Sequence, residues 1–146
     1  MYQILETNDY KGLTEMFFRY GLEVSKDEEA PRNLVKCWEV IRTDNHERVA
    51  GLKLEKRDGV FVIGAIAVEQ AYRNEDIGTL LVAKAIDEVR SASGDSLYLI
   101  AKAPNFFRKS GFNTIEFNSA PNIAKCLTCN QYNVDCFPEI MHLNLG

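Results

Sequence analysis

Hydrophobic and polar residues follow two different spacings along the chain, one typical of helices and one typical of strands. Helical spacing predicts a first helix over 8–20, ended by Gly21. The clearest helical pattern covers 77–90, where one face is apolar and the other is charged. A shorter helix is predicted over 104–110, ended by Gly111. Apolar runs rich in β-branched and aromatic residues predict the strands, which cover 35–42, 49–56, 60–68, 96–101 and 112–117.

The order of these elements favours an α/β fold with a mixed sheet. The pair Asp58-Gly59 is typical of a tight hairpin between two strands. The strand over 60–68 is apolar on both faces, so we expect it at the centre of the sheet. Residues 119–146 show no regular pattern and are expected to form an irregular tail. Because no repeat or linker divides the chain, a single domain over 1–146 is predicted.

Composition and charge narrow the classes of function. The formal net charge is −4, and an acidic chain does not favour binding to nucleic acid, which needs clustered positive charge. The longest unbroken apolar run, 60–68, is too short to span a membrane. The N-terminal residues lack the basic start and apolar run of a signal peptide, so we expect the cytoplasm. The oligomeric state stays open, since an edge strand or the tail could form a homodimer.

The junction between the central strand and the helix over 77–90 has the features of an anion site. The first turn of a helix presents unpaired backbone N–H groups, on which a phosphate can dock. Arg73 adds a cation there, and Gly78 allows close approach of the backbone. The alternative is an ordinary capped junction that binds no ligand.

The residues of this junction resemble the GNAT superfamily of acetyl-CoA-dependent N-acetyltransferases. The pyrophosphate loop of that superfamily reads Gln/Arg-x-x-Gly-x-Gly/Ala, and this chain has Arg73-Asn74-Glu75-Asp76-Ile77-Gly78. The resemblance implies a mixed, mostly antiparallel central sheet flanked by helices, with acetyl-CoA as cosubstrate. Asp76 replaces the middle glycine, and a carboxylate there repels a pyrophosphate. Asp76 is alternatively an N-cap whose side chain bonds a first-turn N–H.

A second segment, LIAKAPNFFRKSGFNTIEF over 99–117, resembles the other coenzyme-binding part of the superfamily. The resemblance implies that the coenzyme contacts Ile66, Ala67, Val68, Arg73, Asn74, Asp76, Ile77, Gly78, Thr79, Asn105 and Phe107. Many relatives have a tyrosine at the position of Phe107, where it protonates the departing thiolate. Losing such an acid slows a reaction by roughly 10²–10⁴-fold. Within the superfamily, this segment and the cysteine-containing tail are most similar to the acetyltransferase domain of N-acetylglutamate synthases.

Acetylation of an amine needs a route for the amine proton. Glu69, just past the central strand, is the candidate base, and its alternative is an exposed loop carboxylate. Tyr72 and Tyr98 are reserve proton carriers or packing aromatics. The resulting hypothesis is acetyl transfer to a primary amine of a small molecule, with amino acids among the candidates. The alternative is a non-catalytic module that binds or senses acyl-CoA, favoured by Asp76 and Phe107.

The tail carries a separate candidate site. Two cysteines spaced Cys-x-x-Cys are a common half-site for zinc, because both thiolates reach one tetrahedral ion. The candidate ligands of a structural zinc are Cys126, Cys129, Cys136 and His142, with Cys37 as a further option. The other interpretation is free thiols in a reducing compartment. A third functional hypothesis is an interaction domain held together by this metal, without a coenzyme.

Overall fold

The computed structural model describes residues 2–19, 34–73, 76–101, 103–116 and 139–145. The described strands form one seven-stranded sheet in the order β1-β2-β3-β4-β5-β7-β6. The strands are β1 (Tyr2–Glu6), β2 (Leu34–Arg42), β3 (Arg48–Arg57), β4 (Val60–Val68), β5 (Ser96–Ala101), β6 (Asn113–Ile115) and β7 (Glu139–Asn144). The helices are α1 (Tyr10–Arg19), α2 (Ile77–Ser91), α3 (Pro104–Arg108) and a short 3-10 turn, η1 (Gln70–Tyr72).

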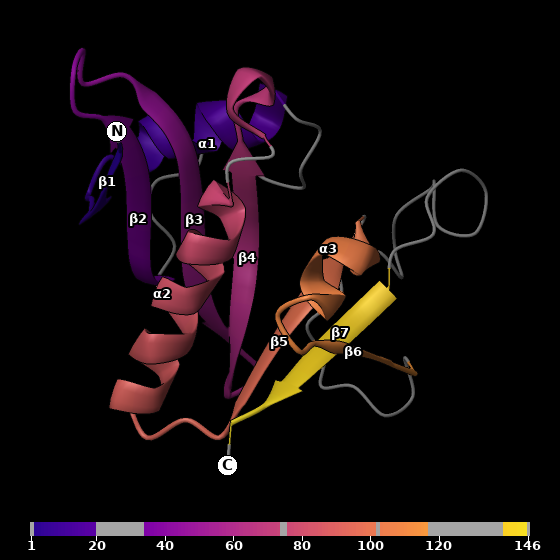
Figure 1. Ribbon diagram of the computed structural model, residues 1–146. Helices are drawn as coiled ribbons and strands as arrows, with labels where there is room; N and C mark the ends of the chain where they lie inside the picture. Colours follow the sequence, from indigo (N-terminus) through magenta and orange to yellow (C-terminus); the bar gives the residue numbers. More distant parts are fainter. Residues whose placement is uncertain (1, 20–33, 74–75, 102, 117–138, 146) are drawn as a thin grey trace.

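The helices cover both faces of the sheet (Figure 1). Helix α2 packs on one face over β3, β4 and β5, and α1 packs on the other face over β3 and β4. The core beneath α2 includes Leu52, Leu54, Leu81, Val82 and Val89, all fully buried. The apolar stripe of α2 therefore supplies one side of this core, as its sequence pattern predicts.

One strand pair differs from all the others. β4 and β5 are the parallel pair, and their register covers only Phe61↔Leu97, Val62↔Tyr98 and Ile63↔Leu99. Beyond Ile63, β4 continues to pair with β3 but no longer with β5. The two strands diverge from this point, so that the sheet is split into two parts (Figure 1). One part holds β1 to β4, and the other holds β5, β7 and β6. The opening lies at the carboxyl ends of both strands.

The predicted fold class, a mixed and mostly antiparallel sheet with flanking helices, is confirmed. The hairpin at Asp58-Gly59 is confirmed as well, with φ of 51° and 79° at the two residues. The prediction of an irregular tail is wrong over 139–144, because β7 lies between β5 and β6 inside the sheet. β1 was not predicted and forms one edge of the sheet. Pairing of an edge strand with a second copy stays a prediction.

A charged cluster lies within the sheet on β3. The side chains of Lys53 and Glu55 are only 6% and 4% exposed, with Lys53 Nζ at 3.4 Å from Glu55 Oε2. Arg57 Nη2 donates to Glu55 Oε1 at 2.7 Å. Gly64 lies opposite, where a Cβ would come within 2.2 Å of Glu55 Oε1. Gly64 therefore makes room for a buried carboxylate held by two cations.

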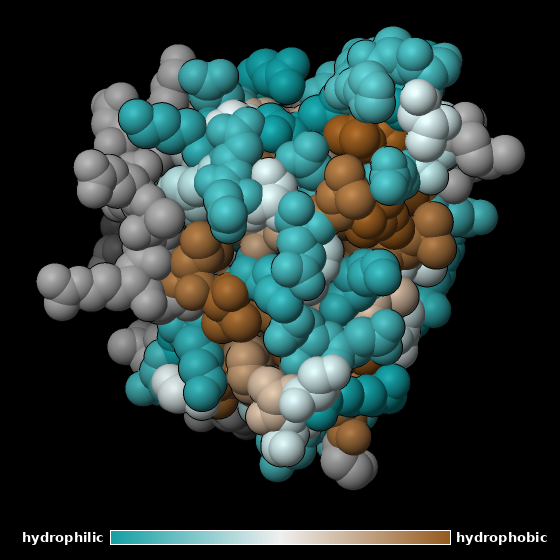
Figure 2. Space-filling view, turned by 90° about the vertical axis from the view of Figure 1, so that its left-hand side faces the viewer, coloured by the Kyte–Doolittle hydropathy of each residue, from teal (hydrophilic) through white to brown (hydrophobic). Residues whose placement is uncertain are grey.

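The surface on the side of β1 and α2 is mostly hydrophilic, with hydrophobic areas separated by polar side chains (Figure 2). Within the described ranges, no helix has the length and apolar character needed to cross a membrane.

Candidate functional site

The opening between β4 and β5 leads to the first turn of α2. The chain leaves β4 at Val68, passes through Glu69 and η1, and enters α2 at Ile77. Arg73 follows η1 and turns back, so that its Nε donates to the carbonyl of Val68 at 3.1 Å. This bond fixes the Arg73 side chain beside the end of β4. The predicted pyrophosphate loop and the predicted contact strand 66–68 therefore meet at one place, although Asn74 lies outside the described residues.

The N-terminus of α2 does not have the side-chain cap that was the alternative prediction for Asp76. Asp76 is the N-cap residue, but its side chain makes no cap hydrogen bond. Its backbone has φ 60° and ψ 17°, the left-handed conformation that glycine adopts most easily. The hypothesis that the Asp76 side chain bonds a first-turn N–H is therefore wrong. The N–H groups of Ile77, Gly78 and Thr79 are not occupied by this carboxylate, which leaves the anion site open to an outside group.

Gly78 lies where three elements meet. A Cβ on Gly78 would be 2.8 Å from Cζ of Phe106 and 3.6 Å from Cγ2 of Val68. Gly78 is itself buried in the first turn of α2, while Phe106 comes from α3 and Val68 from the end of β4. The absence of a side chain thus allows the Phe106 ring to pack against the helix backbone. Phe106 was not among the predicted site residues, since one aromatic in the pair Phe106-Phe107 cannot be told from the other by spacing.

The other predicted residues on α3 are held in the protein. Asn105 Oδ1 accepts from Arg108 Nη1 at 2.6 Å. The ring of Phe107 is buried at 7% exposure. It packs edge-on against Phe106 and Phe112, with centroid distances of 4.9 and 6.0 Å. Phe107 is thus a core residue, which explains why a phenyl ring without a hydroxyl suits this position.

The candidate proton carriers occupy different surroundings. Glu69 directly follows β4, and its Oε1 accepts from Arg19 Nη2 at 3.0 Å. Arg19 is the last residue of α1 and was not predicted as part of the site. Tyr72 lies in η1, and its hydroxyl oxygen accepts from Arg42 Nη1 at 2.9 Å. Glu69 is therefore beside the opening and α1, whereas Tyr72 is tied to the end of β2.

The zinc hypothesis gains no support from the described residues. Cys126, Cys129 and Cys136 lie outside them, and no group of three or more possible ligands occurs within them. His142 is in β7, with Nε2 at 2.9 Å from Ser96 Oγ and its ring stacked on Tyr98. Burial raises the pKa of the Cys37 thiol to about 11, and a metal binds the thiolate form. The zinc site stays a prediction.

Comparisons with known proteins agree with this geometry. A family model described as an acetyltransferase (GNAT) domain matches residues 33–114. None of the curated proteins matches the chain significantly. The fold is similar to a GNAT-family acetyltransferase from Staphylococcus aureus Mu50, with a TM-score of 0.79 and 21% identity over 100% of both chains.

Two structures determined with coenzyme A are also similar. An acetyltransferase from Bacillus subtilis in complex with CoA has a TM-score of 0.73 and 18% identity over 100% of both chains. The N-acetylglutamate synthase from Neisseria gonorrhoeae, complexed with coenzyme A and N-acetyl-glutamate, has a TM-score of 0.77 and 15% identity. It aligns over 100% of this chain and 35% of its own length. At these identities the structural matches establish the fold.

Proposed function

Because the chain belongs to the GNAT family of acetyltransferases, we propose that it transfers the acetyl group of acetyl-CoA to a primary amine of a small molecule. One observation carries the proposal most directly. The opening between β4 and β5 ends at a helix N-terminus whose first-turn N–H groups are not occupied by the Asp76 side chain. The residues present therefore fit the coenzyme, with its pyrophosphate on α2 and its pantetheine arm along β4.

In this proposal, residues at one end of the opening bind the phosphates of the coenzyme, and residues at the other end polarise the thioester. The first turn of α2, together with Arg73, binds the phosphates, and Gly78 permits their close approach. The bound thioester supplies an activated acetyl group. Backbone N–H groups of β4 past Ile63 have no partner strand on the β5 side among the described residues, so they can polarise its carbonyl.

Glu69 is the proposed general base, which accepts the proton of the amine. As the amine nitrogen bonds to the carbonyl carbon, the carbon–sulfur bond breaks and the coenzyme leaves as a thiolate. The amine proton goes to Glu69, directly or through a water molecule. Arg19 orients the Glu69 carboxylate through its 3.0 Å ion pair. Phe107 supplies no proton, so the thiolate leaves without an acid at that position. Tyr72, held by Arg42, is the weaker candidate for a proton carrier.

Amino acids are the first acceptors to test. The Neisseria synthase was solved with N-acetyl-glutamate, which is an amino acid acetylated on its amine. The acceptor of this chain is a proposal that rests on that likeness and on the family. The cytoplasmic location of the protein and its structural zinc stay predictions from the sequence.

Calorimetric titration with acetyl-CoA, followed by mass spectrometry of an amine panel, tests the proposal. We expect micromolar binding and an acetyl mass added to at least one amine, with release of free coenzyme A. Binding without any acetylated product would favour the alternative, a module that binds acyl-CoA without catalysis. Absence of binding would contradict both functions.

Replacing Asp76 with glycine should tighten acetyl-CoA binding about tenfold, which corresponds to roughly 1.4 kcal/mol. The substitution removes a negative charge beside the proposed phosphate site, and glycine adopts the left-handed backbone of this position without steric cost. The measurement is the dissociation constant by calorimetry at two salt concentrations. The gain should shrink at high salt, because salt screens the repulsion.

Asp58→Gly is the matched control for this change. Asp58 also has a positive φ, 51°, but it lies in the hairpin between β3 and β4. The Asp58→Gly substitution removes the same charge at a site away from α2, and it relieves the same kind of left-handed backbone conformation. An equal gain in affinity from both variants would contradict the placement of the phosphates beside Asp76.

A further inference from the structure

The proposed phosphate site depends on how the short turn before α2 is held in place. η1 ends at Tyr72, and the next residue is Arg73, the cation that we assign to the phosphates. Within the turn, the Tyr72 N–H bonds the carbonyl of Glu69 at 2.9 Å, and the Arg73 N–H bonds that of Gln70 at 3.4 Å. A single 3-10 turn has weak internal hydrogen bonds. The position of Arg73 therefore depends on what holds the Tyr72 side chain.

The end of β2 holds the Tyr72 side chain. Arg42 Nη1 donates to the Tyr72 hydroxyl oxygen at 2.9 Å, and this bond is partly buried. The Tyr72 hydroxyl donates in turn to Glu47 Oε2 at 3.5 Å. The shorter bond comes from a charged donor, which makes it the stronger of the two. Arg42 is thus the chief polar contact of the Tyr72 ring.

Asp44 orients the Arg42 guanidinium. Arg42 Nε donates to Asp44 Oδ1 at 3.0 Å, and Arg42 Nη2 donates to Asp44 Oδ2 at 2.5 Å. A two-point contact of this kind fixes the plane of the guanidinium. It leaves Nη1 directed at Tyr72. The turn between β2 and β3 is therefore linked to η1 through one arginine.

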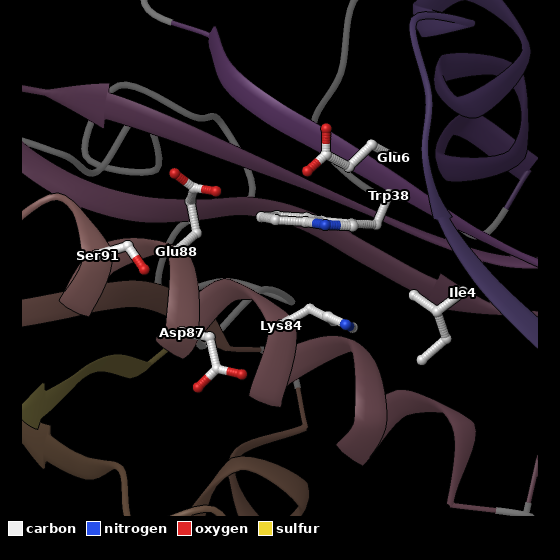
Figure 3. Close-up of a pocket in the computed structure, with 7 residues that line it drawn as sticks. All are labelled: Ile4, Glu6, Trp38, Lys84, Asp87, Glu88 and Ser91. Carbon is white, nitrogen blue, oxygen red and sulfur yellow. The ribbon is translucent and has the colours of Figure 1, made fainter.

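β1 supports the same ring from another side. The rings of Tyr2 and Tyr72 meet edge-on, with 6.0 Å between their centroids. β1 is tied to α2, because Lys36 Nζ binds Glu6 Oε1 at 3.0 Å and Glu88 Oε1 at 2.7 Å. Figure 3 shows Glu6 and Glu88 beside the groove between β1, β2 and α2. The Tyr72 ring therefore packs on a strand that is fixed to the helix of the phosphate site.

We propose that Tyr72, held by Arg42, is a positioning residue for the coenzyme and not a proton carrier. This inference rests on the proposed function. The bond from Arg42 fixes η1, and η1 fixes Arg73 beside the end of β4, where Arg73 Nε donates to the carbonyl of Val68. The Tyr72 hydroxyl already uses its proton toward Glu47 and its oxygen toward Arg42. Breaking the contact should therefore lower the affinity for acetyl-CoA and leave the rate of acetyl transfer unchanged.

Tyr72→Phe tests this role, because phenylalanine keeps the ring and removes the hydroxyl. We expect the dissociation constant for acetyl-CoA, measured by calorimetry, to rise about tenfold. In acetyl transfer to an amine, KM for acetyl-CoA should rise about tenfold while kcat stays within about twofold, since only binding is lost. A fall in kcat at unchanged KM would make Tyr72 a proton carrier and overturn the proposal.

Arg42→Met breaks the same bond from its other side. It should also weaken acetyl-CoA binding about tenfold, and the double variant with Tyr72→Phe should bind no more weakly than Arg42→Met alone. A loss of about 100-fold in the double variant would show independent effects and contradict the proposal. Arg90→Met is the matched control, because it removes an exposed cation from the last turn of α2. It should leave the affinity unchanged.

The outcomes separate this inference from the proposed function. If the parent chain does not bind acetyl-CoA, the proposed function fails and the positioning role fails with it. If the parent chain binds acetyl-CoA and Tyr72→Phe binds it equally well, only the positioning role is overturned. The calorimetric comparison decides between these results whether or not an amine is acetylated.

Discussion

Replacing Gly78 with valine should lower the affinity for acetyl-CoA at least about 100-fold, or about 2.7 kcal/mol. Even the Cβ of a new side chain would lie 2.8 Å from the ring of Phe106. The branched valine must therefore displace that ring or the first turn of α2. Both changes move the backbone N–H groups that we assign to the pyrophosphate. Hydrogen bonds to charged groups contribute about 1.5–3 kcal/mol each, so the loss of one or two accounts for this effect. Calorimetry measures it.

Two further variants separate this local effect from a general loss of structure. Ala83→Val adds a branched side chain at an exposed position of the same helix, and it should leave affinity unchanged. Gly78→Ala combined with Phe106→Ala gives the new Cβ room, and it should bind more tightly than Gly78→Ala alone. Wild-type affinity in Gly78→Val would remove α2 from the proposed phosphate site.

Replacing Glu55 with alanine should lower the free energy of unfolding by about 3–5 kcal/mol. The carboxylate accepts from Arg57 at 2.7 Å and lies 3.4 Å from the ammonium of Lys53. Without Glu55, Lys53 would keep a charge in a side chain that is only 6% exposed. An unpaired buried charge costs more than the lost ion pair contributed. Urea unfolding followed by circular dichroism gives the free energy.

The ion pair itself is tested by removing both charges. Lys53→Met combined with Glu55→Leu should recover most of the stability, because no buried charge is then left by the pair. Asp44→Ala removes the ion-pair partner of Arg42 at the surface, and it should have no measurable effect. A loss below about 1 kcal/mol in Glu55→Ala would show that the cluster is open to water.

Much of the fold could be predicted because its elements carry strong local patterns. The strand over 60–68 and the helix starting at Ile77 were predicted with the bounds that β4 and the start of α2 have. β7 was not predicted, because Glu139 and His142 interrupt a segment of only six residues. β1 is one residue shorter and lies at an edge, with three of its five residues exposed. Both strands depend on long-range pairing, which a local pattern does not record.

The site could be predicted to the level of segments but not of contacts. The motif around Arg73 and Gly78 located the junction, because the spacing of the glycine is a local property. The left-handed backbone of Asp76 was not predicted, since aspartate both caps helices and tolerates positive φ. The contact between Gly78 and Phe106 joins residues from α2 and α3. Only the packing of the two helices brings them together.

The position of β7 inside the sheet governs the order in which a growing chain can assemble. β5 pairs with β4 over three residue pairs and with β7 over six. A nascent chain that has emerged from the ribosome only as far as residue 115 therefore carries β5 with one long edge unpaired. An open edge of this kind is a template for association with other chains. During synthesis, β5 is thus open to association with other chains until residues 139–144 insert between β5 and β6.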